Sequence, residues 1–223
     1  MATSTTGLAA DREAMVERQL RQRGITDPDI LAAFHAVPRE AFISGEYAHL
    51  AYGDHPLPIE AGQTISQPYI VALMIEAAAI KPGDKVLEVG SGSGYAAAVI
   101  SRIAASVVGI ERQHDLVEIA RERLTRLGYD NVDIVEGDGT KGWPDRAPYD
   151  AILAAASGSH VPDPLIDQLK AGGRLVMPLG GPGWVQRLVR VTKQPDGSLM
   201  ESDLGAVRFV PLIGEEGWKD GRS

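Results

Sequence analysis

The sequence contains no cysteine, which excludes a disulfide framework, a thiolate metal site and a cysteine nucleophile. Its five histidines are scattered, and no two have the spacing of ligands on one helix, so no metal site is expected. No run of about 18 apolar residues occurs, so no membrane span is expected. The first ten residues also lack the basic and apolar run of a secretory signal, and the expected compartment is therefore the cytoplasm.

Basic residues are fewer than acidic ones. Lys and Arg number 22 against 30 Asp and Glu, which gives a formal net charge of -8. Such a chain is poorly suited to binding a phosphate backbone without sequence specificity, so no nucleic-acid partner is expected. The 223 residues, 44% of them hydrophobic, are enough for one domain with a sizeable core and a modest appendage.

The pattern of apolar residues predicts helices first and then an alternation of strands and helices. One helix is expected from a cap at Asp11 to Gly24, a second over 28–37 and a third from Pro68. Strands are then expected over residues 85–89, 106–111, 132–135, 149–154 and 174–178, with helices over 95–104, 115–127 and 163–169. These units predict a parallel sheet covered on both faces.

After residue 184 two apolar runs flank the turn sequence QPDGS (194–198), which predicts an antiparallel hairpin. The expected fold is therefore α/β. It is a doubly wound, Rossmann-like and mostly parallel sheet with a C-terminal antiparallel hairpin and an N-terminal helical extension. The expected division is a helical extension and loop over 1–61, an α/β core over 62–181, and a hairpin with its tail over 182–223.

A glycine-rich loop, EVGSGSG (88–94), lies between the first predicted strand of the sheet and the helix that follows. Glycines there permit a tight turn and the close approach of a ligand to bare backbone. An ordinary tight turn between a strand and a helix is the alternative interpretation. The position of the loop after a buried strand favours the ligand site.

Three acidic residues are expected at the same edge of the sheet, where the parallel strands end. Glu88 precedes the loop, Glu111 ends the second strand, and Asp138 follows the third. Each alone is compatible with a solvated loop charge or a helix cap. Together they suit a cationic nucleoside without phosphates, because carboxylates repel a pyrophosphate but attract a cation and accept from ribose hydroxyls. S-adenosylmethionine, with a sulfonium, an ammonium and a ribose, is such a molecule.

The sequence shows no cluster that announces a general base. An acceptor that is already ionised at pH 7, such as a carboxylate with a pKa of about 4, needs none. Such an acceptor needs orientation and exclusion of water, which hydroxyl and backbone N–H donors provide. The segment GQTISQP (62–68) offers such donors.

The glycine loop resembles the first motif of the class I methyltransferases, and Gly109-Ile110-Glu111 resembles the second. Over about residues 11–212 the chain closely resembles the protein-L-isoaspartate (D-aspartate) O-methyltransferases. Six motifs carry this resemblance in the family's order: VPREAF (37–42), GQTISQPY (62–69), LEVGSGSGY (87–95), EGDG (136–139), APYDAI (147–152) and VRFVPL (207–212).

The resemblance implies transfer of a methyl group from S-adenosylmethionine, leaving S-adenosylhomocysteine. The acceptor is the free carboxylate of an L-isoaspartyl or D-aspartyl residue in a damaged protein, and the ester then forms a succinimide. By position, Ser66 matches the active-site serine of the family. The expected cofactor-binding residues are Gln63, Thr64, Ile65, Glu88, Gly90, Ser91, Gly92, Gly94, Glu111, Asp138 and Gly139. Isoaspartyl peptides and proteins are the expected partners, and the expected state is a monomer.

Several alternatives stay open at this point. From sequence alone the favoured interpretation of Ser66 is the N-cap of the helix from Pro68, and only the family resemblance assigns it to the active site. His160 is favoured as a loop or capping residue over a catalytic base. The loop over 156–162 is more polar than the family pattern, and no role is assigned after Leu212. One alternative is a related enzyme that methylates an aspartate in a dedicated peptide precursor. Another is a non-catalytic module that only binds the cofactor.

Overall fold

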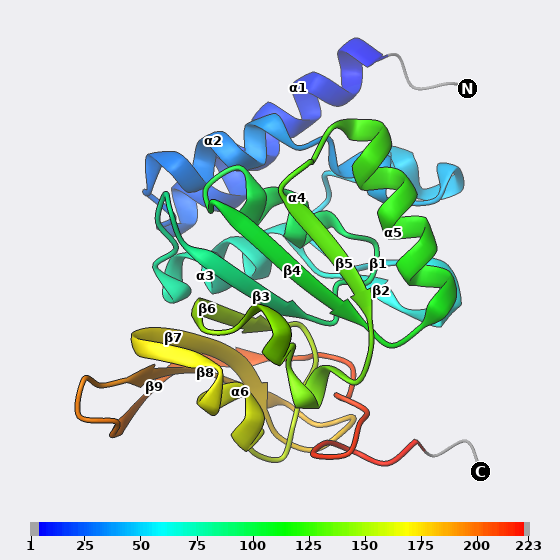
Figure 1. Ribbon diagram of the computed structural model, residues 1–223. Helices are drawn as coiled ribbons and strands as arrows, with labels where there is room; N and C mark the ends of the chain where they lie inside the picture. Colours follow the sequence, from blue (N-terminus) through cyan, green and yellow to red (C-terminus); the bar gives the residue numbers. More distant parts are fainter. Residues whose placement is uncertain (1–4, 221–223) are drawn as a thin grey trace.

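The computed structural model describes residues 5–220, and its centre is a seven-stranded sheet with the order β5-β4-β3-β6-β7-β8-β9 (Figure 1). The strands are β3 (Lys85–Val89), β4 (Ser106–Glu111), β5 (Val132–Glu136), β6 (Tyr149–Ala154), β7 (Leu169–Leu179), β8 (Gln186–Lys193) and β9 (Leu199–Val207). Strands β3 to β7 pair in parallel, whereas β7, β8 and β9 pair antiparallel. The predicted fold class, including the C-terminal hairpin, is confirmed.

Strand β7 is longer than the sequence predicts. The apolar run predicts a strand over 174–178, but β7 begins at Leu169, which pairs with Tyr149. The register shifts before the next pair, Ala151 with Arg174, and Gly172 in this stretch has φ +77°. The helix α6 (Asp163–Asp167) is correspondingly shorter than the predicted 163–169. The sequence pattern did not predict this irregular start because it contains Gly172 and Gly173. Glycines interrupt the apolar pattern of a strand but do not prevent pairing at a bulge.

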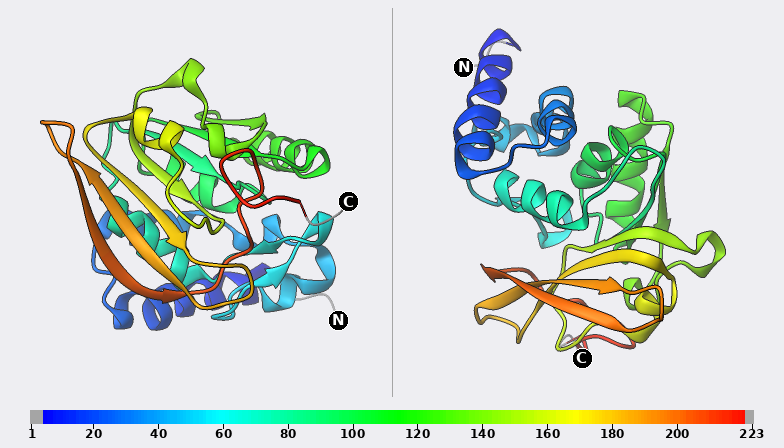
Figure 2. Two further views of the ribbon diagram at one scale, coloured as in Figure 1. Left: turned by 90° about the horizontal axis from the view of Figure 1, so that it is seen from below. Right: turned by 90° about the vertical axis from the view of Figure 1, so that its left-hand side faces the viewer.

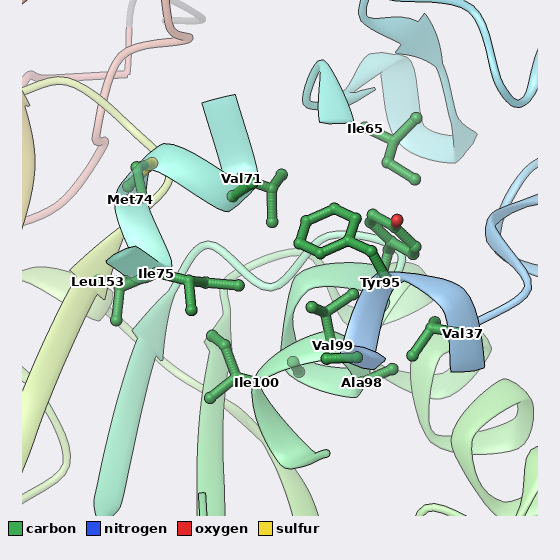
Figure 3. Close-up of a cluster of buried hydrophobic side chains, with 14 of the residues drawn as sticks. Val37, Ile65, Val71, Met74, Ile75, Tyr95, Ala98, Val99, Ile100 and Leu153 are labelled. Carbon is green, nitrogen blue, oxygen red and sulfur yellow. The ribbon is translucent and has the colours of Figure 1, made fainter. Parts of the chain in front are cut away.

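Helices cover both faces of the sheet. They are α1 (Thr5–Met15), α2 (Pro28–Ala36), α3 (Pro68–Ala78), α4 (Tyr95–Ser101), α5 (His114–Leu127) and α6. Side chains alternate along each strand, so Val86 joins a core with the helices from α1 to α5, while Leu87 and Val89 join a second core with Leu165 of α6. Figure 3 shows part of the first core, where Val71 and Ile75 of α3 lie near Tyr95 and Val99 of α4.

The N-terminal helix differs from prediction at its start. Asp11 does not cap it, because α1 begins at Thr5 and places Asp11 in its interior. Leu8, Ala9 and Ala10, immediately before Asp11, are good helix formers and continue the helix past the expected cap. The helix continues through a π-helical and a 3-10 turn to Gly24, whose φ of +100° ends it as predicted.

A small antiparallel ribbon precedes α3. Strand β1 (Leu57–Pro58) pairs with β2 (Thr64–Ile65), and the loop between them spans the expected boundary at residues 61 and 62. The division of the chain into three segments stays a prediction. Residues 62–65 line the same cavity as Val89 at the end of β3 and Glu111 at the end of β4. The ribbon therefore holds residues 62–66 beside the ends of the strands.

Candidate active site

One large cavity lies at the carboxyl ends of β3, β4 and β6, where a doubly wound sheet places its ligands. Its volume is about 1200 Å³, which exceeds what a nucleoside cofactor alone requires. Ten of the residues expected from the sequence line it: Gln63, Thr64, Ile65, Ser66, Glu88, Gly90, Ser91, Gly92, Glu111 and Gly139. Gly94 and Asp138 are absent from this lining. The fold thus unites the glycine loop with a segment that lies more than 20 residues earlier in the chain.

The glycine loop is fixed to the neighbouring strand through its backbone. Gly90 N and Ser91 N both donate to Ile110 O of β4, at 2.8 and 3.1 Å. Gly90 and Gly92 have φ values of +84° and +51°, in the region that disfavours residues with a side chain. The loop therefore presents bare backbone to the cavity.

Glu111 is oriented by three backbone donors. Its Oε2 accepts from Gly92 N at 3.0 Å, and its Oε1 accepts from the N–H groups of Arg112 and Gln113 at 2.8 and 2.9 Å. A carboxylate has about four acceptor sites, so one stays available to a ligand hydroxyl. This is the arrangement expected of an acid that binds a ribose.

Glu88 is the buried acid of the cavity. Its side chain is 2% exposed, and its Oε2 has no hydrogen-bond partner among residues 5–220. Burial raises the pKa of Glu88 to about 8, and the nearby Glu111 carboxylate contributes to this rise. An acid held in this way gains a counter-charge when a cationic group enters the cavity.

Two buried hydroxyl residues, Ser91 and Tyr95, also line the cavity. Ser91 lies beside the Glu88 carboxyl and Tyr95 beside the buried guanidinium of Arg39, and neither hydroxyl makes a hydrogen bond of good geometry within residues 5–220. Ser91 packs against the backbone of Gly109, where any side chain would collide with it. Unpaired buried polar atoms are costly, so Glu88 Oε2 and Ser91 Oγ favour a polar ligand in this part of the cavity. With the bare backbone, these two atoms fit the ammonium, sulfonium and ribose of S-adenosylmethionine.

Gly94 and Asp138 make structural contacts beside the cavity, and their expected contacts with the cofactor stay predictions. A side chain on Gly94 would meet Ala120 and Leu124 of α5, so this glycine lets α4 pack closely against α5. Asp138 Oδ1 accepts from Thr140 N and Oγ1, and its Oδ2 accepts from Glu215 N at 2.8 Å. Partial burial alone raises the pKa of Asp138, but these hydrogen bonds outweigh it and hold the pKa below its usual value.

Ser66 does not cap the following helix. The N-cap of α3 is Gln67, with no side-chain cap hydrogen bond, and Ser66 Oγ makes no hydrogen bond to any described residue. Ser66 lines the cavity that is also lined by Glu88 and the glycine loop. The structure thus removes the capping interpretation and leaves a donor available to a ligand.

The C-terminal segment is the part of the site that sequence reasoning missed. Ile213, Trp218, Lys219 and Asp220 line the cavity, although no role was expected after Leu212. Glu215 N binds Asp138, and Trp218 Nε1 donates to Ser157 O at 2.9 Å. The apolar VRFVPL run just before this segment was the only sequence signal that pointed to it. The contacts themselves could not be predicted, because they join positions 60 to 80 residues apart.

The polar loop over 156–162 also has a structural explanation. Ser157 is fully buried and exchanges backbone hydrogen bonds with Val210 and Leu212, both at 2.8 Å. His160 is exposed, its Nδ1 lies 3.0 Å from Ser159 Oγ, and it is not among the residues that line the cavity. The structure therefore favours the interpretation of His160 as a loop residue.

Among residues 5–220, no group of three or more His, Cys, Asp or Glu side chains is arranged to hold a metal ion. None of the helices in the same range is long and apolar enough to cross a membrane.

Comparison with known proteins places this architecture in one family. The sequence model of protein-L-isoaspartate (D-aspartate) O-methyltransferase matches residues 10–217. A Pelobacter propionicus protein named protein-L-isoaspartate O-methyltransferase 2 is 56% identical over 207 residues, covering 93% of this chain and 92% of its own. A Rhodopseudomonas palustris protein named protein-L-isoaspartate O-methyltransferase 1 is 54% identical over 96% of this chain and 87% of its own.

Solved structures agree. A structure of a protein-L-isoaspartate O-methyltransferase superposes with a TM-score of 0.84 at 34% identity, covering 92% of this chain and 66% of that one. A Plasmodium falciparum structure, described as such an enzyme in complex with S-adenosyl-L-homocysteine, gives 0.78 at 29% identity and covers 91% and 98%. These matches extend over nearly the whole chain, and the chain is a member of the protein-L-isoaspartate (D-aspartate) O-methyltransferase family.

Proposed function

We propose that this protein transfers a methyl group from S-adenosylmethionine to the free carboxylate of L-isoaspartyl, and of D-aspartyl, residues in damaged proteins. The ester then closes to a succinimide, and hydrolysis returns part of the material to normal aspartate. The observation that carries the proposal is a single cavity that joins the unpartnered hydroxyl of Ser66 to the buried acid Glu88 and the glycine loop.

The chain contributes binding, orientation and charge. When bound, S-adenosylmethionine supplies a methyl group on a positively charged sulfur, which a carboxylate oxygen can displace. Glu88 and Glu111 provide the negative charge and the acceptor that suit its cationic and ribose groups. Ser66 donates a hydrogen bond to one acceptor oxygen and so directs the other, which is already ionised at neutral pH and needs no base.

The defining experiment compares two peptides that differ only in one residue, L-isoaspartyl or normal L-aspartyl. Methyl ester is detected as methanol released by base after incubation with S-adenosylmethionine. We expect esterification of the isoaspartyl peptide and little or none of its partner. Equal labelling of both peptides, or of neither, contradicts the proposal.

Replacing Ser66 with alanine should reduce kcat about 10- to 100-fold, because the acceptor carboxylate loses an orienting donor. Affinity for S-adenosylhomocysteine should change less than about twofold, and thermal stability should not change, because Ser66 caps no helix. Single-turnover rates, calorimetry and thermal melts measure these three quantities. Ser159→Ala, in the exposed loop outside the cavity, is the matched control. An equal loss of cofactor affinity and rate would contradict this role.

The reported relatives carry the name of the isoaspartate enzyme, which disfavours a precursor-specific relative and a module that only binds the cofactor. Activity confined to one partner peptide would support the precursor-specific relative. Tight cofactor binding without turnover would support the module that only binds the cofactor. A monomeric state, a cytoplasmic location and the lack of nucleic-acid or membrane partners stay predictions. Sedimentation of the purified protein tests the first of these.

A further inference from the structure

Exposed apolar side chains gather at one part of the cavity mouth. Trp184 is 77% exposed, Val185 57% and Val210 38%. Val185 and Val210 line the cavity, and Trp184 is the chain neighbour of Val185. We call these three residues the apolar rim. Of the large hydrophobic side chains exposed within residues 5–220, the other three are Leu50, Leu199 and Met200, which are not among the cavity-lining residues.

The apolar rim is held in place from two directions. Gln186 follows Val185, and its side chain accepts from Phe209 N at 2.7 Å and donates to Phe209 O at 3.1 Å, next to Val210. On the other flank, Gly180 N donates to Gly158 O at 2.9 Å, and Trp184 N to Gly181 O at 3.3 Å. Figure 2 shows the β7–β8 loop beside the segment that follows β9. The two valines therefore occupy opposite sides of one hydrogen-bonded junction.

Exposure of these side chains contributes nothing to folding, because burial is what makes an apolar side chain stabilising. Exposed apolar side chains at a cavity mouth are typical of a binding surface, and tryptophan is enriched among residues that dominate such surfaces. The inference rests on the proposed function, which requires the substrate to be a polypeptide whose modified residue enters the cavity. The neighbouring residues of that polypeptide must then pass over the mouth, since an extended chain advances only about 3.4 Å per residue.

We propose that the apolar rim binds an apolar or aromatic side chain adjacent to the isoaspartyl residue of the substrate polypeptide. Trp184 supplies the largest contact, and Val185 and Val210 form the base against which the incoming side chain packs. The protein should accordingly prefer damaged sites with apolar neighbours over sites with small polar neighbours.

The test measures peptide binding directly, with S-adenosylhomocysteine present, by fluorescence anisotropy of labelled isoaspartyl peptides. One peptide carries leucine on both sides of the isoaspartyl residue, and its partner carries serine. The wild-type protein should bind the leucine peptide about tenfold more tightly. Trp184→Ser should remove most of that preference while leaving the serine peptide and S-adenosylhomocysteine affinity within about twofold. Met200→Ser, a comparably exposed residue in the terminal hairpin, should keep the preference.

Several results would overturn the inference. One is an equal loss of affinity for both peptides in Trp184→Ser. Another is a wild-type protein that binds the leucine and serine peptides equally. A third is a dimer in sedimentation that dissociates on Trp184→Ser with peptide preference intact, because the rim would then contact a second copy. If the proposed function were wrong but the apolar rim did bind such side chains, the peptides would bind with the expected preference and no methyl ester would form.

Discussion

Gly92→Val should abolish measurable cofactor binding, a loss of more than about 100-fold in affinity. Gly92 has φ +51°, and a Cβ there would lie 3.3 Å from Ile59 Cδ1. A β-branched residue is poorly accommodated at this φ, so the loop must change its backbone. That change breaks the hydrogen bond from Gly92 N to Glu111 Oε2 and displaces the loop backbone that lines the cavity. Calorimetry with S-adenosylhomocysteine measures the loss.

The matched control is Gly128→Val. Gly128 ends α5 with φ +75°, lies outside the cavity, and none of the described residues would come within 4 Å of a Cβ there. Valine at this position therefore carries the backbone strain, on the order of 1–2 kcal/mol, without touching the site. We expect reduced thermal stability with normal cofactor affinity. If Gly92→Val bound the cofactor normally, the glycine loop would not be part of the cofactor site.

Cofactor affinity should depend on pH through Glu88. The pKa of Glu88 is about 8 in the cofactor-free protein, mainly because the carboxyl is buried, so the group is largely protonated at pH 7. A cationic ligand favours the ionised form. Binding of S-adenosylmethionine should therefore release close to one proton at pH 6–7, and affinity should rise up to tenfold per pH unit until it levels off above about pH 8. Titration calorimetry in buffers of different ionisation enthalpy counts the protons.

Glu88 should also make the stability of the cofactor-free protein depend on pH. Between about pH 4.5 and pH 8 the folded protein holds one proton more on Glu88 than the unfolded chain does. The free energy of unfolding of the cofactor-free protein should therefore fall as pH rises through this window, by an amount on the order of a few kcal/mol. Chemical denaturation at pH 5.5 and pH 8 measures the difference.

Glu88→Gln separates charge from shape. The amide keeps the size of the side chain but cannot ionise, so the variant should lose the proton release and most of the pH dependence of binding. It should also be more stable than the wild-type protein at pH 8 without cofactor, and bind S-adenosylmethionine more weakly. Unchanged proton release in Glu88→Gln would assign the titration to another group.

The ordered architecture around β3 to β6 was predictable, because each buried parallel strand is a short apolar run and each ends at a polar or glycine-rich loop. The motifs also indicated most of the residues that line the cavity. The start of β7 was not predictable, because its first residues pair across a register shift among glycines. The start of α1 was misplaced because a capping residue inside a helix looks the same in sequence as one at its end.

The sequence by itself determined the α/β fold class, the acids at the strand ends and the glycine loop, because these depend on local spacing along the chain. Only the tertiary structure decided the rest. It freed Ser66 from a capping role, gave Asp138 and Gly94 their structural contacts, and brought the C-terminal segment and the apolar rim to the cavity mouth. Those outcomes depend on contacts between distant positions, and no local pattern of side chains encodes which distant backbone will meet them.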